Sequence, residues 1–156
     1  MDRVEKPIKD LVELIEEPLK SGKEIALVIR GNSMWPLLHE GVDKILLKRV
    51  DFYNICDIIL YRRNSGDYVL HRIIGKKNGA FILAGDGEYH KEYPIYESQI
   101  LAKATGGIRK GKPFSCDSKR YKIYSLIWSK ILPLRPIVIK IGYQLMRLRN
   151  WCKGLK

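Results

Sequence analysis

The sequence has few cysteines, and they form no motif. Among its 156 residues only Cys56, Cys116 and Cys152 are cysteine, and no two of them lie close together. An odd number without paired spacing indicates neither a disulfide framework nor a zinc site. We therefore expect a reducing compartment and a fold held by its hydrophobic core, in a chain with room for one main domain.

The sequence also lacks a long uncharged apolar run. Lys130, Arg135 and Lys140 interrupt its most hydrophobic stretch, so no window of about 18 uncharged apolar residues is left to form a membrane-spanning helix. In the N-terminal segment, Val4 to Leu19, apolar residues recur at helical spacing with acidic residues between them. This pattern predicts an amphipathic helix rather than a signal peptide. The expected location is the cytoplasm or the periphery of a membrane.

Acidic residues are missing from the C-terminal segment. Ser118 to Lys156 holds 10 basic residues and no acidic one, whereas Met1 to Asp117 holds 19 basic and 17 acidic residues. Apolar residues recur at helical spacing on both sides of Pro133 and Pro136, which predicts two basic amphipathic helices with a proline break. The apolar positions of this pattern are Ile123, Leu126, Ile127, Ile131, Leu134, Ile137, Ile141, Leu145 and Leu148.

Three roles are open for this basic tail. Its composition suits an anionic membrane surface, where aromatic side chains act as anchors at the interface. The alternatives are helices that pack on the domain and, because the segment has no acidic residue, a nucleic-acid contact. The apolar content favours lipid or packing over nucleic acid, and no base-reading motif is present. The candidate interfacial anchors are Tyr121, Tyr124, Trp128, Tyr143 and Trp151.

Between the two ends the pattern is typical of β structure. Short β-branched and aromatic runs alternate with turns rich in Asn and Gly, which accept the positive φ that hairpins need. We expect a mainly β fold, with an antiparallel sheet folded on itself, an N-terminal amphipathic helix and a basic helical tail. The predicted strands are Ile25 to Arg30, Lys44 to Val50, Asp57 to Arg63, Tyr68 to Lys76, Ala80 to Ala84 and Ile100 to Ala104.

A serine and a histidine in this region form a candidate catalytic pair. Ser33, in the motif Gly-Asn-Ser-Met-Trp-Pro, follows an apolar run and falls where a strand gives way to a turn, which presents its hydroxyl outward. His71 lies in a predicted strand, on the same face as Val69 and Ile73. A neutral imidazole can take the proton of a hydroxyl, and serine needs such a base to act as a nucleophile.

These motifs resemble those of the signal peptidase I and LexA-like superfamily of serine peptidases. The likeness covers about Ile25 to Lys110 and consists of the serine motif, a strand at Asp57 to Arg62, His71-Arg72 and Gly85-Asp86. A histidine in the place of the usual bacterial lysine is similar to the endoplasmic reticulum and archaeal type. Within this superfamily, the chain most resembles the small bacterial S24/S26 peptidase-like proteins. The resemblance implies a coiled β fold that binds its substrate as an extra strand in a groove.

Transferred residue by residue, the resemblance implies Ser33 as the nucleophile, His71 as the general base and Asp86 as the acidic residue that orients the imidazole. The N–H of Ser33 would then supply part of an oxyanion hole. Gly31 stands where some signal peptidases have a second hydroxyl donor, and Cys56 stands where the family has glycine. This chemistry needs no metal and no organic cofactor.

The first hypothesis is a serine endopeptidase, a hydrolase that cleaves peptides or leader-bearing precursors through an acyl-enzyme. The alternative is a catalytically inactive peptidase-like module that binds an extended peptide or a membrane. Three segments follow from the pattern: an N-terminal amphipathic helix at residues 1–22, a peptidase-like β domain at residues 23–117 and a basic helical tail at residues 118–156.

Overall fold

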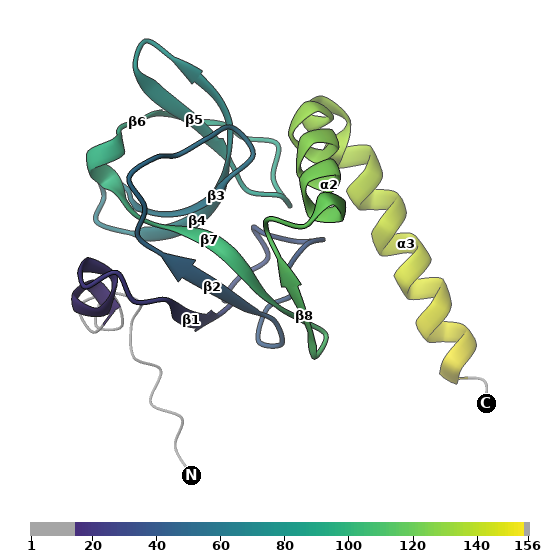
Figure 1. The fold of residues 1–156 in the computed structure, drawn as a ribbon. Helices are drawn as coiled ribbons and strands as arrows, with labels where there is room; N and C mark the ends of the chain where they lie inside the picture. Colours follow the sequence, from purple (N-terminus) through teal and green to yellow (C-terminus); the bar gives the residue numbers. More distant parts are fainter. Residues whose placement is uncertain (1–14, 155–156) are drawn as a thin grey trace.

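An antiparallel sheet of eight strands forms the body of the protein, and two long helices follow it (Figure 1). The computed structural model describes residues 15–154, with only the backbone at residues 143, 146 and 148–154. Within this range the predicted mainly β, antiparallel fold class is confirmed. The strands are β1 (Ile25–Val28), β2 (Lys44–Lys48), β3 (Ile58–Arg62), β4 (Tyr68–Lys77), β5 (Ala80–Ala84), β6 (Glu92–Ile95), β7 (Ile100–Arg109) and β8 (Lys112–Ser115).

All six predicted strands are present, and two further strands were not predicted. The predicted runs match β1 to β5 to within a few residues, while β7 is longer than its run. The additional strands, β6 and β8, each contain a proline, Pro94 and Pro113. Proline weakens a strand pattern because it cannot donate to a ladder, but it is tolerated at an edge. Both strands are edges of the described sheet, in which β6 pairs only with β5 and β8 pairs only with β7.

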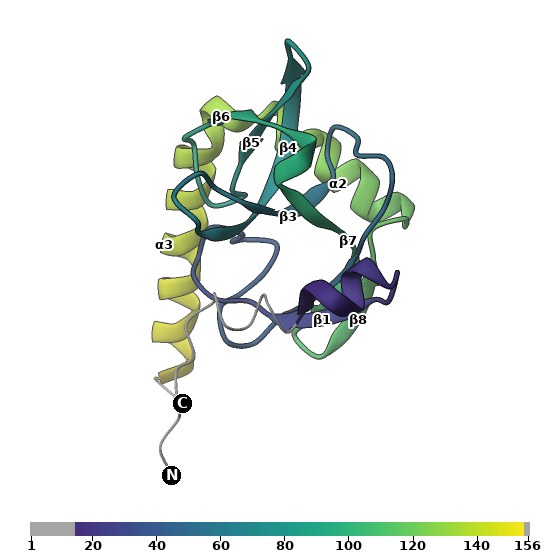
Figure 2. The same ribbon diagram turned by 90° about the vertical axis from the view of Figure 1, so that its left-hand side faces the viewer.

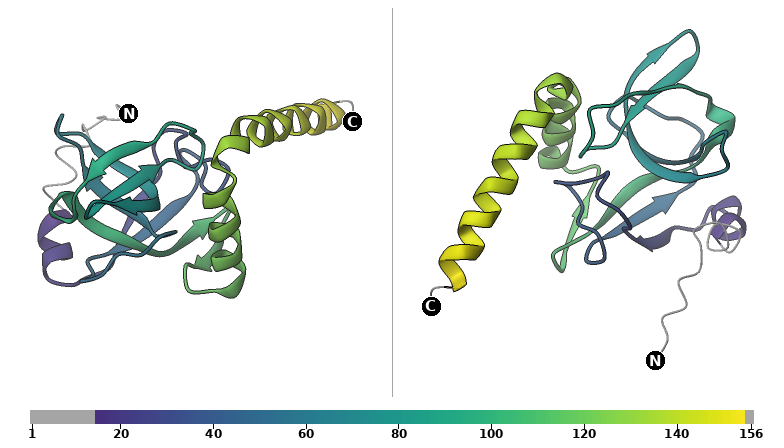
Figure 3. Two further views of the ribbon diagram at one scale, coloured as in Figure 1. Left: turned by 90° about the horizontal axis from the view of Figure 1, so that it is seen from above. Right: turned by 180° about the vertical axis from the view of Figure 1, so that it is seen from behind.

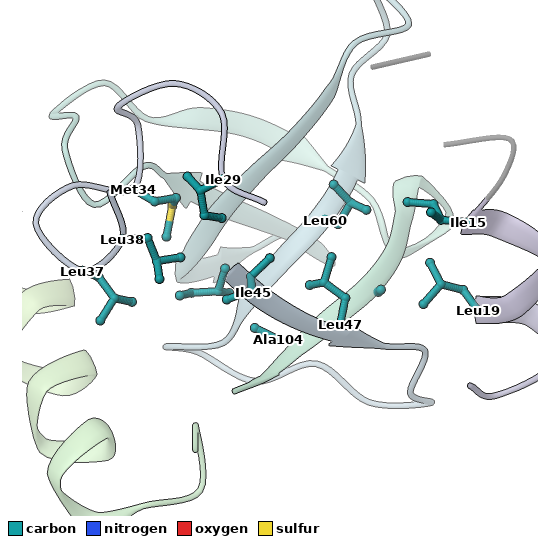
Figure 4. Close-up of a cluster of buried hydrophobic side chains, with 12 residues drawn as sticks. Ile15, Leu19, Ile29, Met34, Leu37, Leu38, Ile45, Leu47, Leu60 and Ala104 are labelled. Carbon is teal, nitrogen blue, oxygen red and sulfur yellow. The ribbon is translucent and has the colours of Figure 1, made fainter. Parts of the chain in front are cut away.

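The sheet coils so that two hydrophobic clusters cover its two faces. Its strand order is β1-β2-β7-β3-β4-β5-β6, and β3 in the middle is buried on both sides. Ile58 and Leu60 point into one cluster, while Ile59 and Tyr61 point into the other. Figure 4 shows the first cluster running along β2, with Met34 near one end and Ile15 at the other.

The N-terminal helix is described only in part. Residues 15–20 are helical and lie next to β1 (Figure 2), with Ile15 and Leu19 buried in the first cluster. The earlier part of the predicted helix, from Val4, lies outside the described residues. The buried pair is spaced four residues apart, as expected for the apolar face of a helix.

The basic tail forms two helices with a break at the prolines, as predicted. These are α2 (Lys119–Lys130) and α3 (Arg135–Gly154), joined by the short 3-10 helix η2 (Leu132–Leu134). Ser118 caps α2, because its hydroxyl accepts the N–H of Tyr121. Helix α2 packs against the sheet, whereas α3 runs away from it (Figure 3). None of the helices within residues 15–154 is both long and apolar enough to cross a membrane.

Candidate active site

Ser33 lies in a closed turn directly after β1, as predicted. The two ends of this turn are tied together, since the N–H of Ile29 donates to the carbonyl of Asp43 and the N–H of Gly41 donates back to the carbonyl of Ile29. Met34 and Trp35, next to the serine, are buried. The turn is therefore fixed to the core on both sides of Ser33, while Ser33 itself stays half-buried.

His71 lies in β4, where it pairs with Ile59 of β3. Only 1% of it is exposed to solvent. Its strand neighbours Val69 and Ile73 belong to the second cluster, so the predicted apolar face of this strand is confirmed. The imidazole is thus held in an apolar wall, which fixes its position and removes most of its hydration.

Ser33 and His71 line the same cavity, which has a volume of about 450 Å³. Gly85 lies where the two meet. A Cβ placed on Gly85 would lie 2.5 Å from the carbonyl oxygen of Ser33 and 3.1 Å from Nε2 of His71. The structure thus brings the first two predicted residues side by side. The remaining lining is mainly aliphatic, with charged groups at its border: Leu27, Val28, Ile29, Arg30, Met34, Ile45, Leu47, Leu60, Arg63, Tyr68, Val69, Leu70 and Glu88.

The Nε2 atom of His71 is free to act as an acceptor. It is buried and has no hydrogen-bond partner among residues 15–154. Oε2 of Glu88 lies 3.4 Å away but lacks the geometry of a hydrogen bond. The Ser33 hydroxyl does not hydrogen-bond to this nitrogen, and in serine–histidine pairs such a bond commonly tightens only when substrate is bound.

The other ring nitrogen, Nδ1, faces two polar side chains. The hydroxyl of Tyr61 lies 3.2 Å away and Oε1 of Glu92 lies 3.3 Å away. Glu92 also accepts from Nε of Arg63 at 2.9 Å. A carboxylate beside Nδ1 favours the tautomer that carries its proton there, which leaves Nε2 as the acceptor toward the cavity. We assign this tautomer from the partners of the ring.

Burial sets the protonation state of these groups. Burial lowers the pKa of His71 from 6.5 to about 4, although the Glu92 carboxylate acts in the opposite direction. Burial also raises the pKa of Glu88, and the charge of Glu92 adds to that effect. Burial acts on Glu92 too, but its bonds to Arg63 and Tyr61 outweigh this and lower its pKa. At neutral pH the imidazole is therefore neutral, and the Glu92 carboxylate beside it is charged.

Asp86 does not contact His71, and here the structure departs from the expected triad. Its carboxylate accepts Nε and Nη2 of Arg72 at 2.8 and 2.6 Å, and Nη2 of Arg135 lies 4.0 Å away. Neither Asp86 nor Arg72 is exposed. Because Arg72 alternates with His71 along β4, its side chain points to the opposite face of the sheet and takes Asp86 with it. The carboxylate that reaches the imidazole is that of Glu92.

The loop that carries Gly85 and Asp86 is held between the serine turn and the tail. The N–H of Gly87 donates to the carbonyl of Ser33 at 2.7 Å. From the other side, Nη1 of Arg135 donates to the carbonyl of Gly85 at 2.6 Å, and Nε1 of Trp128 donates to the carbonyl of Asp86 at 3.0 Å. The two long helices therefore form part of the support of the site.

Three of the tail aromatics expected as interfacial anchors contact the domain in this arrangement. Trp128 is buried against the loop, and Tyr121 and Tyr124 lie beneath the guanidinium of Arg72, 5.7 and 5.8 Å from it. They anchor α2 to the domain, as expected for tail helices that pack on it, with Trp128 buried and the two tyrosines half-buried. The side chains of Tyr143 and Trp151 lie outside the described residues.

Sequence reasoning missed Tyr61, Glu88 and Glu92. A signal for Tyr61 was available, because in a β3–β4 hairpin it lies diagonally across from His71 on the same face. Glu92 had no such signal, since its strand was not predicted and its approach to His71 depends on the curvature of the sheet.

No group of three or more His, Cys, Asp or Glu within residues 15–154 is arranged to hold a metal ion. Neither the family models nor the curated proteins compared with this chain give a match. Its class must therefore be argued from the site itself.

Proposed function

We propose that this chain is a serine endopeptidase of the signal peptidase I and LexA-like type, with Ser33 as nucleophile and His71 as general base. One observation carries the proposal. A buried neutral imidazole, whose Nε2 has no partner in the described part of the chain, faces a cavity that Ser33 also lines. A buried acceptor without a partner is costly, and it persists where it serves chemistry.

The reaction follows from these positions. Nε2 of His71 takes the proton of the Ser33 hydroxyl as Oγ bonds to the substrate carbonyl carbon. The C–N bond then breaks, and His71 returns the proton to the leaving amine. Water, deprotonated by the same nitrogen, hydrolyses the acyl-enzyme. Among the described residues no group accepts the backbone N–H of Ser33, so it is available to the oxyanion.

The cavity and the sheet edge suit an extended peptide. Strand β1 pairs only with β2 among the described strands, which leaves its outer edge open to a further strand. Leu27, Ile29 and Leu70 give the cavity an aliphatic wall, so an apolar side chain next to the scissile bond fits best.

A backbone feature supports the family resemblance. Cys56 stands where the family has glycine, and its φ is +79°, in the left-handed region that glycine adopts most readily. The backbone at this position has the form that a glycine would favour, although the side chain differs.

The second candidate is a peptidase-like module that binds an extended peptide without cutting it. The position of Glu88 favours this alternative, because its carboxylate lies 3.4 Å from the nitrogen that would have to serve Ser33. Burial raises the pKa of Glu88. The two candidates differ in one outcome, the formation of a covalent bond at Ser33.

The test is labelling of the full chain with a fluorophosphonate probe, read by intact mass and peptide mapping. The proposal predicts one adduct, on Ser33, that is lost in Ser33→Ala and strongly reduced in His71→Ala. Ser65→Ala, which changes an exposed turn serine, is the matched control and should label like the wild type. A parallel incubation with a proteome-derived peptide mixture should produce new peptide ends only when Ser33 is present. Folded protein that neither labels nor cleaves would favour the binding module instead.

A further inference from the structure

Helices α2 and α3 each expose one row of large aliphatic side chains. On α2 the exposed fractions are 60% for Ile123, 50% for Leu126 and 54% for Ile127. The row on α3 is similarly exposed. It comprises Ile137, Val138, Ile141 and Leu145. We call these seven residues the outer helical face.

On α2 this face points away from the sheet. Its buried side is formed by Ser125 and Trp128. At about 100° per residue, Ile123, Leu126 and Ile127 lie on the opposite side of the helix. The predicted amphipathic pattern of α2 is therefore present. The aromatic and polar side of the helix contacts the domain, and its aliphatic side remains exposed.

On α3 the aliphatic row lies within an arc of about 100° around the helix axis. A Cβ on Gly142 would lie 2.9 Å from the ring of Trp35, so this side of α3 lies against the serine turn. Ile141 and the other row residues lie to one side of that contact and remain exposed. The face is thus held in a fixed position relative to the domain.

The charged residues of α2 and α3 are all basic, and Asp117, the acidic residue that precedes α2, pairs with Lys122. Exposed cations lie on both helices: Lys119, Arg120, Lys122, Lys130, Lys140 and Arg147. The whole segment from Ser118 to Lys156 contains no acidic residue. On α2, Lys119 and Lys130 lie on the same side as the aliphatic row, by helical spacing. An apolar strip bordered by cations matches a surface that is apolar inside and anionic at its rim.

We propose that the outer helical face binds the surface of an anionic lipid bilayer, with α2 and α3 lying in the interfacial plane. The aliphatic rows enter the boundary between headgroups and acyl chains, and the lysines contact the lipid phosphates. Nucleic acid would match the charge but would leave the aliphatic rows without a partner. A second copy would match the aliphatic rows but would bring two strongly cationic segments together. This inference does not depend on peptidase activity.

The test is flotation of the full chain with large unilamellar vesicles of phosphatidylcholine containing 30% phosphatidylglycerol, compared with pure phosphatidylcholine. We expect at least about tenfold tighter binding to the anionic vesicles, falling as salt is raised because the charges are exposed. Equal binding to both vesicle types, or none to either, would overturn the proposal. This comparison uses only the wild-type protein and so does not depend on the folding of a variant.

Variants locate the contact. Leu126→Asp combined with Ile137→Asp should weaken vesicle binding at least about tenfold, because charges enter the apolar strip. Phe52→Asp is the matched control, since Phe52 is a large exposed apolar residue elsewhere, 80% exposed, and it should bind like the wild type. Circular dichroism checks that both proteins keep their fold. Wild-type binding by a folded Leu126→Asp/Ile137→Asp protein would overturn the proposal, as would tight binding to duplex DNA without binding to vesicles.

Discussion

The Arg72 guanidinium and the Asp86 carboxylate form a buried ion pair through two parallel contacts, of 2.8 and 2.6 Å. The third nitrogen of the same guanidinium, Nη1, donates to the carbonyl of Cys56 and to the hydroxyl of Ser125, both at 2.8 Å. Strand β4, the Gly85 loop and helix α2 therefore meet at one side chain. Neither partner of the pair is exposed, so each depends on the other for its charge balance.

Removing either charge should destabilise the protein strongly. We expect Arg72→Met and Asp86→Asn each to lower the free energy of unfolding by about 3–5 kcal/mol, because each leaves an unpaired buried charge. Urea denaturation measures this. Lys122→Met removes an exposed ion pair with Asp117 and should cost less than about 1 kcal/mol. If Asp86→Asn lowered the free energy of unfolding no more than Lys122→Met does, the buried ion pair would contribute little to stability.

Stability should fall in mildly acidic solution because of His71. Its pKa is about 4 in the folded protein, against the ordinary value of 6.5 that applies to the unfolded chain. Above pH 6.5 the imidazole is neutral in both states. As the pH falls from 6.5 toward 4, the unfolded chain binds a proton that the native chain does not, which removes about 3 kcal/mol of stability.

The measurement is the free energy of unfolding between pH 7.5 and 4 for the wild type and for His71→Gln. Subtracting the variant removes the contribution of the carboxylates that titrate in the same range. A difference between the two proteins that does not change with pH would contradict a buried neutral imidazole.

Under the proposed function, Glu92 should matter for the reaction more than Asp86 does. Its carboxylate lies beside Nδ1 of His71 and raises the pKa of that group, so Glu92→Gln should lower this pKa further. If Glu92 orients the base, the variant should also slow acylation of Ser33 by about a hundredfold or more. The pKa of His71 can be measured from its imidazole chemical shifts as a function of pH. If Glu92 had only a structural role, Glu92→Gln would leave this pKa unchanged.

Asp86→Asn is the matched comparison. It should lower stability while changing the labelling rate of Ser33, per folded molecule, much less than Glu92→Gln. The reverse order of effects would restore Asp86 to the role that the resemblance implies.

Replacing Cys56 by glycine should stabilise the protein slightly. The residue has a φ of +79°, which costs a side-chain-bearing residue about 1–2 kcal/mol, and glycine gives back about 0.5–1 kcal/mol through its greater freedom in the unfolded chain. The expected gain is up to about 1 kcal/mol by thermal or urea denaturation. Cys116→Gly, at a position without a positive φ, should instead destabilise. If Cys56→Gly and Cys116→Gly lost the same amount of stability, the backbone at Cys56 would not be strained.

Local patterns predicted much of the fold. The turn at Lys76 to Gly79 followed from its Asn and Gly, and both Asn78 and Gly79 have a positive φ. The face of β4 that carries His71 followed from strict alternation along the strand. In both cases the deciding interactions lie within a few residues of sequence, where pattern reasoning works well.

The rest depended on distant contacts. Periodicity showed that α2 has two faces but not which one is buried, because that choice is made by Arg72, which binds Ser125 and lies against Tyr121. The partner of Nδ1 in His71 was missed for the same reason. Glu92 arrives there through the pairing of β6 with β5, which no local pattern in the sequence encodes.

The bond from Arg135 to the carbonyl of Gly85 links the timing of synthesis to the assembly of the site. Ribosomes release a chain from its N-terminus, so the strands, which end at Ser115, emerge before the helical tail does. The sheet can therefore form first. During that interval the Gly85 loop has no guanidinium from the tail, and the carbonyl of Asp86 has no indole beside it. A nascent chain therefore has its serine and histidine before it has the support that fixes their neighbours. Under the proposed function, reactivity at Ser33 should appear only after residue 135 has left the ribosome.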